Sequence, residues 1–382
     1  MKIGILTQPL HINYGGLLQN YALQTVLKDM GHEVMTFDIR RPQQAWLRDY
    51  LSSLKSFVKD FFSLHDIPGE YFTTIEQETI IRQNTNRFID KYINRTQPVF
   101  KKEDFYSIAS EEKFDGYVVG SDQVWRPLYN SYLTSMFLDF VDDDNVKKMA
   151  YAASFGTSDW EYDDKQTQIC NNFAKRFNLI TVREKSGVKL CKEHFGIDAT
   201  HVLDPTMLLK REDYERLVES EKEPHHKGGL FYYFLDPSEK KFQLIGDFAQ
   251  KEGLMPFTVL PKYQPQQRTK EIVENHIEDC IYPSVTSWLR AFMDAEMVIG
   301  DSFHCAVFSI IFNKPFWVVS NSERGNARFA SLLNLFHTEK RLIEERHPVN
   351  NNCDNLIDWE NINVSISDNR LLSMNSLRSI FS

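Results

Sequence analysis

The stretch MVIGDSFHCAVFSIIFNKPFWVV, residues 297–319, predicts a strand, a helix and a second strand. Its first residues, Met297–Ile299, form a short apolar run that is typical of a buried strand. Gly300 allows a tight turn, and the following apolar residues recur with helical spacing until Asn313–Pro315 ends the helix. Phe316–Val319 is apolar again and predicts the next strand. This βαβ unit indicates an α/β fold built on parallel sheets.

The helix of this unit has a histidine, His304, in its first turn. We expect Asp301 or Ser302 to cap the helix by accepting a bond from a free first-turn amide. The free amides and the helix dipole make a helix start favourable for anions. His304 could therefore donate a proton to an anionic substrate. The alternative is that His304 bonds a neighbouring carbonyl and only supports the turn.

The composition is that of a globular protein with room for two domains. The chain has 382 residues, of which 42% are apolar and 25% are charged. A net charge of −9 argues against non-specific binding to nucleic acid. The aromatic content of 13% suits sugar-binding clefts, although large cores use aromatic residues too.

The cysteines and the apolar runs indicate a cytoplasmic protein. The five cysteines are scattered and show neither a disulfide framework nor paired metal-ligand spacing, so we expect a reducing compartment and no metal. The first apolar run is too short for a signal peptide, and no run reaches transmembrane length. We therefore expect a cytoplasmic protein that at most lies against the inner face of a membrane.

The N-terminal residues predict a ligand-type turn after the first strand. Strand Lys2–Thr7 is followed by a loop containing Asn13, Gly15 and Gly16, and then by a helix from residue 17 to about 30. Ligands in doubly wound sheets bind at the carboxyl ends of strands. The two glycines do not make a dinucleotide fingerprint. The loop either forms a tight turn or brings backbone amides and Asn13 close to a ligand.

Residues 42–113 interrupt the α/β rhythm, and we expect a helical insertion there. Aromatic residues recur near helical spacing over 46–62, and a second helix is expected over Ile75–Tyr92. The aromatic helix could rest on a membrane surface or receive a lipid-linked acceptor. Its nearly balanced charge instead favours a helix packed against the protein.

Polar residues also follow two later strands. Ser121 and Asp122 come after a short apolar strand, and Asp122 could orient or deprotonate an acceptor hydroxyl or only cap its turn. Arg183 ends another strand, and its planar guanidinium suits a phosphate or a carboxylate. The alternative for Arg183 is an ion pair with Glu184 or Asp204.

A break at Asp204–Thr206 divides the chain into two predicted Rossmann-like domains. The N-terminal domain covers residues 1–205 with the helical insertion, and the C-terminal domain covers 206–382 with a polar tail. Because ligand-type residues follow strands in both, we expect the site in the interdomain cleft. Arg324 and Arg328, which follow the last strand of the opening unit, could face this cleft.

The chain resembles the polysaccharide pyruvyl transferase family in blocks that run in family order over residues 1 to about 335. The blocks are Asn13–Gly16 with Leu18–Leu23, Gly120–Trp125, Tyr151–Gly156, Arg183–Gly187, Asp204–Thr206 and Gly300–Cys305. The resemblance implies a GT-B-like fold of two Rossmann-like domains, with the acceptor on the N-terminal side and the donor on the C-terminal side.

The resemblance also implies an activity. A pyruvyl group would pass from phosphoenolpyruvate to hydroxyls of a sugar in a cell-surface or exopolysaccharide precursor, usually as a cyclic ketal. Arg183 would hold the phosphate or carboxylate of the donor, and His304 would be the acid. The family needs no cofactor, and its partners are phosphoenolpyruvate and a saccharide acceptor that could be lipid-linked. The oligomeric state is not predicted.

The sequence departs from the family at one important place. Many relatives have Arg-Leu-His where this chain has Ser302, Phe303 and His304. Ser302 removes one cation that is expected near the donor. Either Arg324 or Arg328 replaces that cation, or the affinity for the donor or its identity differs.

Two other functions fit the same fold. One is a glycosyltransferase that uses a nucleotide sugar, which should show an acidic residue for the ribose in the second domain. The other is a catalytically silent glycan-binding protein, to which Ser302 gives some weight. Release of phosphate from phosphoenolpyruvate separates the enzyme from the silent protein.

Overall fold

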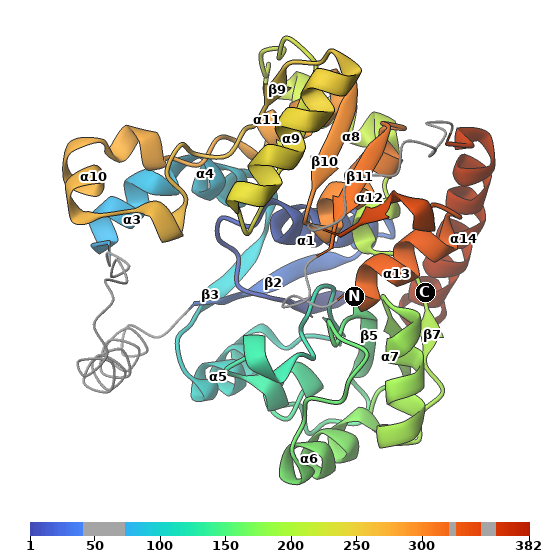
Figure 1. Cartoon of the computed structure of the whole chain (residues 1–382). Coiled ribbons are helices and arrows are strands. Elements are labelled where there is room, and N and C mark those ends of the chain that lie inside the picture. Colours follow the sequence, from blue (N-terminus) through green and yellow to red (C-terminus); the bar gives the residue numbers. More distant parts are fainter. Residues whose placement is uncertain (41–72, 321–325, 345–356) are drawn as a thin grey trace, which may run out of the picture.

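The computed structural model describes residues 1–40, 73–320, 326–344 and 357–382, and it contains two parallel sheets flanked by helices (Figure 1). The N-terminal sheet has seven strands in the order β3-β2-β1-β4-β5-β6-β7, and the C-terminal sheet has five in the order β12-β11-β10-β8-β9. The strands of the N-terminal sheet are β1 (Lys2–Leu6), β2 (Glu33–Ile39), β3 (Arg95–Val99), β4 (Gly116–Val119), β5 (Lys147–Ala153), β6 (Leu179–Val182) and β7 (Thr200–His201). Those of the C-terminal sheet are β8 (Leu230–Tyr233), β9 (Pro256–Phe257), β10 (Met297–Gly300), β11 (Phe316–Val319) and β12 (Leu342–Ile343).

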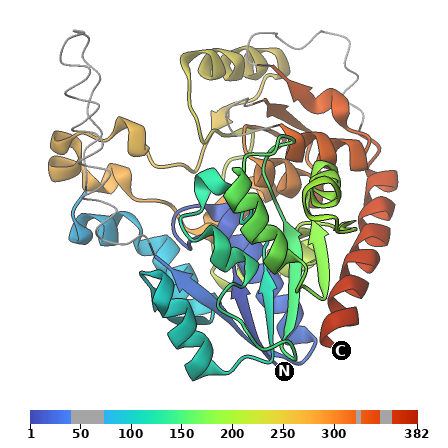
Figure 2. The ribbon, with the colours of Figure 1, turned by 90° about the horizontal axis from the view of Figure 1, so that it is seen from below.

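Helices cover both faces of the N-terminal sheet (Figure 2). Alternate strand residues face two separate apolar clusters, with Val118 in one and its neighbour Val119 in the other. Strands buried on both faces read as continuous apolar runs, which is why the sequence identifies β4 and β10. The helices before residue 200 are α1 (Tyr14–Asp29), α3 (Ile75–Ile81), α4 (Gln83–Tyr92), α5 (Lys102–Glu112), α6 (Asp164–Ala174) and α7 (Lys185–Leu190). The later helices are α8 (Arg211–Ser220), α9 (Glu239–Glu252), α10 (Lys270–Asn275), α11 (Val285–Asp294), α12 (Phe303–Ile311), α13 (Ala327–Leu335) and α14 (Trp359–Phe381).

The predicted helical insertion over residues 42–113 is wrong in its second part. β3 pairs in parallel with β2 at the edge of the sheet, and α5 follows it, so this part continues the α/β rhythm. The sequence of β3, RTQPV, is polar and contains Pro98, which an edge strand tolerates. The helix predicted over Ile75–Tyr92 is the pair α3 and α4. The predicted aromatic helix lies outside the described residues.

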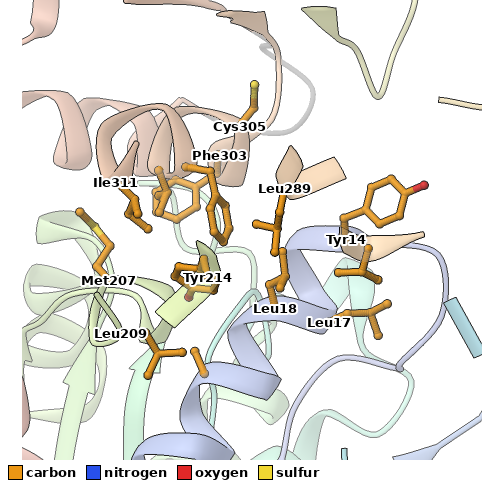
Figure 3. Packing of buried hydrophobic residues seen from close by; sticks show 14 of the residues in the cluster. Tyr14, Leu17, Leu18, Met207, Leu209, Tyr214, Leu289, Phe303, Cys305 and Ile311 are labelled. Atoms are coloured by element: carbon orange, nitrogen blue, oxygen red, sulfur yellow. The ribbon is translucent and has the colours of Figure 1, made fainter. Parts of the chain in front are cut away.

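One apolar cluster joins the two halves of the molecule. Leu18 of α1 packs in the same cluster as Phe303 of α12 (Figure 3). The ring of Tyr14, at the start of α1, stacks on Trp288 of α11 with 5.7 Å between ring centroids. The Tyr14 hydroxyl also donates to the carbonyl of Pro283 at 2.9 Å. These contacts fix the first turn of α1 against the C-terminal half.

The last helix, α14, returns to the N-terminal half (Figure 1). The amide of Leu203 donates to Ser373 Oγ at 3.0 Å, and Arg370 Nε donates to the carbonyl of Met207 at 2.9 Å. Phe381 is buried against β4, where a Cβ on Gly116 would lie 2.8 Å from its ring. The tail that the sequence assigns to the C-terminal domain therefore covers part of the N-terminal sheet.

Candidate active site

The C-terminal half contributes the start of α12, the helix of the βαβ unit that the sequence predicts. The expected cap is absent, because Ser302 precedes α12 without a side-chain bond to it and Asp301 binds elsewhere. Asp301 Oδ1 accepts from the amide of Leu235 at 2.7 Å, and Oδ2 accepts from Lys241 Nζ at 2.7 Å. Because Asp301 is buried, its negative charge is stable only when such hydrogen-bond and ion-pair partners offset the loss of water. His304 therefore lies in a first turn that no side chain caps.

The N-terminal half contributes the start of α1, which begins earlier than predicted. Asn13 is its N-cap, and Asn13 Oδ1 accepts from the amide of Gly16 at 3.2 Å. A Cβ on Gly15 would lie 2.1 Å from His304 Nδ1, so the backbone of Gly15 contacts the imidazole directly. The two glycines thus belong to the first turn of a helix, and Gly15 permits the close approach of the two halves.

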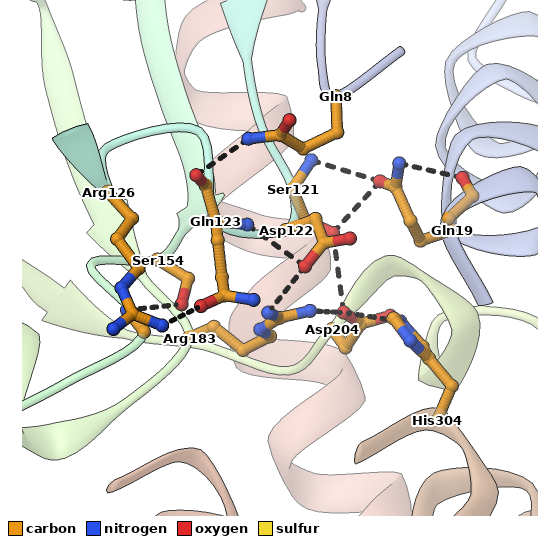
Figure 4. A network of polar contacts seen from close by, with 12 residues as sticks. Gln8, Gln19, Ser121, Asp122, Gln123, Arg126, Ser154, Arg183, Asp204 and His304 are labelled. Carbon is orange, nitrogen blue, oxygen red and sulfur yellow. Dashed lines mark hydrogen bonds and ion pairs between the residues drawn. The ribbon is translucent and has the colours of Figure 1, made fainter. Parts of the chain in front are cut away.

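Arg183, at the end of β6, lies between two carboxylates (Figure 4). Its Nη1 donates to Asp204 Oδ2 at 2.8 Å, and its Nη2 donates to Asp122 Oδ1 at 3.0 Å. The side chain of Arg183 is only 1% exposed, so both ion pairs are shielded from water. The ion pair with Asp204 that the sequence allows is therefore present. A direct contact between Arg183 and a donor stays a prediction.

Asp204 connects this ion pair to the histidine of the other half. His304 Nε2 lies 3.6 Å from Asp204 Oδ2, the oxygen that also binds Arg183. This distance is longer than a normal hydrogen bond, and the two groups form an ion pair when the imidazole is protonated. The candidate acid and the buried arginine thus share one carboxylate oxygen.

A network of amide and hydroxyl groups supports these charges. The amide and hydroxyl of Ser121 donate to Gln19 Oε1 at 3.0 and 2.9 Å, and the Ser121 hydroxyl lies 3.3 Å from Asp204 Oδ2. Gln19 Nε2 donates to Thr7 Oγ1 and to the carbonyl of Gly16, both at 2.9 Å. Ser121 therefore ties the turn after β4 to α1 and to Asp204, and its side chain is fully buried.

The two carboxylates beside Arg183 stay ionised despite their burial. Burial alone would raise the pKa of Asp204, but His304 and Arg183 outweigh it and hold that pKa well below its ordinary value. Burial also acts to raise the pKa of Asp122, and the positive charges of Arg183, His304 and Arg328 lower it overall. Both side chains are therefore weak bases.

A second arginine approaches the same centre. The guanidinium carbons of Arg183 and Arg328 lie 4.4 and 5.9 Å from the centroid of the Phe303 ring. Arg328 is only 7% exposed. Its burial, together with repulsion by Arg183, lowers the pKa of Arg328 to about 10. Because Arg183 is already paired with Asp122 and Asp204, the charge that this position can offer to an anion is that of Arg328.

Glu184 has a structural role beside Arg183. Its Oε1 accepts from the amides of Phe155 and Gly156 at 2.7 and 3.3 Å. Burial raises the pKa of Glu184, although the charge of Arg183 opposes this. Glu184 therefore connects the turn after β5 to the start of α7.

The structure brings most of the predicted site residues together at Asp204 and at the starts of α1 and α12. They are Asn13, Gly15, Gly16, Ser121, Asp122, Arg183, His304 and Arg328. Arg324 lies outside the described residues, and Ser302 is buried at the start of α12. The sequence did not select Asp204, Gln19 or Phe303 as site residues. Asp204 could have been found from its place directly after a strand, whereas Gln19 looks like any other helix residue.

In residues 1–40, 73–320, 326–344 and 357–382, no group of three or more His, Cys, Asp or Glu is arranged to hold a metal ion. No helix within the same ranges is long and apolar enough to cross a membrane. The charged groups that the structure does gather are the arginines, aspartates and histidine of the centre.

Comparison with known proteins gives a family and a fold. The model of the polysaccharide pyruvyl transferase family matches residues 13–323. No protein of a curated set matches the sequence significantly. MnaA of S. aureus, in a co-structure with UDP, is similar with a TM-score of 0.52 and 10% identity, over 96% of this chain and 87% of that one. UGT89C1 of Arabidopsis thaliana, complexed with UDP-L-rhamnose, has a TM-score of 0.51 and 8% identity. The match covers 99% of this chain and 98% of UGT89C1. Such low identities show the fold alone, and it is the GT-B arrangement of two Rossmann-like halves.

We expect Gly15→Ala to lower the free energy of unfolding by about 1–3 kcal/mol. The added methyl would lie 2.1 Å from His304 Nδ1 and 2.6 Å from its Cβ, so the two halves would have to separate. Gly16→Ala is the matched control, because its methyl would meet no atom nearer than 3.4 Å and should stabilise α1 or leave it unchanged. Urea unfolding measures both, and equal stability of the two variants would contradict the direct contact.

We expect Arg183→Met to lower the free energy of unfolding by about 3–5 kcal/mol at about pH 7, because it leaves Asp122 and Asp204 buried without their cation. The wild-type pKa values of both carboxyls are lowered, so their stabilisation is present above the unfolded value of about 3.9 and is lost below it. In the variant, burial would raise these pKa values, so the carboxyls would become neutral at higher pH. The deficit measured by urea unfolding should therefore shrink towards about pH 4. A deficit that grows as the pH falls would show that Arg183 does not stabilise these charges.

Proposed function

Because the chain belongs to the polysaccharide pyruvyl transferase family, we propose that it transfers the pyruvyl group of phosphoenolpyruvate to a sugar. The acceptor would be a cell-surface polysaccharide precursor, and two of its hydroxyls would form a ketal with C2 of the pyruvyl group. The observation that carries this proposal is the position of buried Arg328 beside the Phe303 ring, at the start of the helix that carries His304. This arrangement joins an anion site to a proton donor.

The donor site is proposed at Arg328 and the first turn of α12. Phosphoenolpyruvate carries a phosphate and a carboxylate, and its negative charge would relieve the repulsion between Arg328 and Arg183. The first-turn amides of α12 add donors and the positive end of the helix dipole. Ser302 supplies no cation here, and we propose that Arg328 takes the place of the family arginine. Arg183 would not contact the donor but would hold Asp122 and Asp204 in position through its two ion pairs.

The first chemical step is addition to the donor double bond. His304 gives a proton to C3 of phosphoenolpyruvate, which becomes a methyl group, and C2 becomes electron-deficient. A sugar hydroxyl oxygen forms a bond to C2 and loses its proton. The lowered pKa of Asp122 makes it a poor acceptor for that proton. The neutral imidazole left after the first transfer is the better base. His304 would therefore act first as the acid towards C3 and then as the base towards the sugar hydroxyl.

The second step closes the ketal. The bond from C2 to the phosphate oxygen breaks, and the electron pair leaves with the phosphate. A second hydroxyl of the same sugar forms the new bond to C2, and its proton leaves with the phosphate. Arg328 and the amides of α12 would stabilise the charge that develops on the departing phosphate.

A contact at the end of β8 supports this donor over a nucleotide sugar. Donors in doubly wound sheets bind beyond the carboxyl ends of the strands, where backbone amides can contact a diphosphate. In this chain the amides of Leu235 and Asp236 donate to the side chain of Asp301 at 2.7 and 3.1 Å. These amides are thus already occupied by a carboxylate that also binds Lys241.

We expect phosphoenolpyruvate at about 100 times its dissociation constant to raise the unfolding free energy of the wild type by about 2.7 kcal/mol. Arg328→Met should lose most of this gain. The matched control is Arg341→Met, which removes another buried arginine whose guanidinium lies 4.8 Å from a ring centroid, that of Trp317. Thermal melting measures all three proteins. A shift with UDP-glucose and none with phosphoenolpyruvate would instead support the nucleotide-sugar enzyme.

We expect His304→Gln to keep the stabilisation by phosphoenolpyruvate and to lose acceptor-dependent phosphate release by about 10²–10⁴-fold. The glutamine side chain can form hydrogen bonds as histidine does, but it cannot donate or accept a proton as an acid or a base at neutral pH. Colorimetric phosphate release with a mixture of polysaccharide precursors measures the rate. Unchanged release by His304→Gln would exclude the histidine as the acid. Binding of phosphoenolpyruvate by the wild type without any release would favour the silent glycan-binding protein.

A further inference from the structure

The turn that follows β4 exposes two neighbouring apolar side chains. After Asp122, the same segment reaches a short 3₁₀ turn, Pro127–Tyr129. The side chain of Leu128 is 70% exposed and that of Tyr129 is 42% exposed. Single exposed apolar residues are common on protein surfaces, but adjacent ones on a turn that also carries a site residue suggest a binding surface.

The ring of Tyr129 is held in place from one side. The guanidinium carbon of Arg126 lies 4.6 Å from the ring centroid, and Arg126 is itself only 5% exposed. Glu161 binds Arg126 through two bonds of 2.9 Å each, to Nε and to Nη2. The amide of Tyr129 donates to the carbonyl of Arg126 at 3.1 Å. One face of the aromatic ring is therefore close to a buried arginine.

The same turn is connected to the proposed donor site. Arg126 Nη1 lies 3.5 Å from Gln123 Oε1, and Gln123 follows Asp122 in the chain (Figure 4). Asp122 Oδ1 accepts from Arg183 Nη2 at 3.0 Å, and Arg183 and Arg328 lie around the same Phe303 ring. The turn that carries the ring therefore begins beside the centre to which Arg183 and Arg328 belong.

We propose that Tyr129, together with Leu128, binds the acceptor sugar by stacking on one face of its pyranose ring. This inference rests on the proposed function, because it assigns the acceptor of that reaction. The C–H groups on one face of a pyranose are apolar, while its hydroxyls lie around the edge. A rigid aromatic ring can bind that face at little cost in conformational entropy and leave the hydroxyls accessible to the donor. Tyr129 is therefore assigned as a positioning residue for the acceptor.

Saturation-transfer NMR with methyl glucoside, methyl galactoside and methyl mannoside tests this inference without any donor. The wild type and Tyr129→Phe should both transfer saturation to the ring C–H protons of at least one glycoside, because stacking needs the ring and not the hydroxyl. Tyr129→Ala should bind that glycoside about 3- to 10-fold more weakly. The matched control is Tyr106→Ala, since Tyr106 is a similarly exposed tyrosine, at 45%, on α5.

The outcomes separate this inference from the proposed function. Tyr129→Ala should retain the full stabilisation by phosphoenolpyruvate, which shows that the donor site is intact. No saturation transfer to any glycoside with the wild type, or equal transfer with Tyr129→Ala, would overturn the acceptor subsite. An equal loss of binding in Tyr106→Ala would also overturn it. Absence of stabilisation by phosphoenolpyruvate in the wild type would instead refute the donor assignment.

Discussion

The geometry of the site depends on the buried ion pairs of Arg183 with Asp122 and Asp204. These residues follow three strands of one sheet, so the charges bring three strand ends to a common point. Buried ion pairs add little net stability, since desolvation offsets the attraction, but they tolerate few alternative arrangements. We infer that these ion pairs fix the position of Asp204. Among the residues that the structure describes, Asp204 is the carboxylate of the N-terminal half that lies nearest to His304, with 3.6 Å between Oδ2 and Nε2.

The site is complete only when the two halves are in contact. The imidazole comes from the C-terminal half, and the glycine backbone against which it rests comes from the N-terminal half. The shared apolar cluster and the stacking of Tyr14 on Trp288 keep those two helix starts together. The proposed acid therefore depends on packing between halves as much as on the turn that carries it.

The sequence predicted the parts of the fold that local patterns determine. β10, α12 and β11 were found because their apolar runs, a glycine and a proline mark each boundary. β3 was missed because an edge strand needs no continuous apolar run.

Contacts between residues far apart in the chain leave no local pattern in a single sequence. Residues 15 and 304 meet only because two helix starts face each other. The role of Asp301 was mispredicted for a related reason, because a partner outside its own turn, Lys241, competes with the cap. The sequence did not indicate that Tyr129 belongs to a binding surface, because this depends on the packing of Arg126 against its ring.

The return of α14 to the N-terminal half has a consequence for biosynthesis. The N-terminal sheet ends with β7, yet Leu377 and Phe381 of α14 belong to the apolar cluster on one of its faces. A ribosome makes the whole C-terminal half before it makes this helix. The nascent N-terminal half would therefore expose that apolar patch throughout translation of the second sheet, and chaperones could bind it during this interval. Docking of α14 would then follow synthesis of the second sheet and cover this apolar face of the N-terminal sheet.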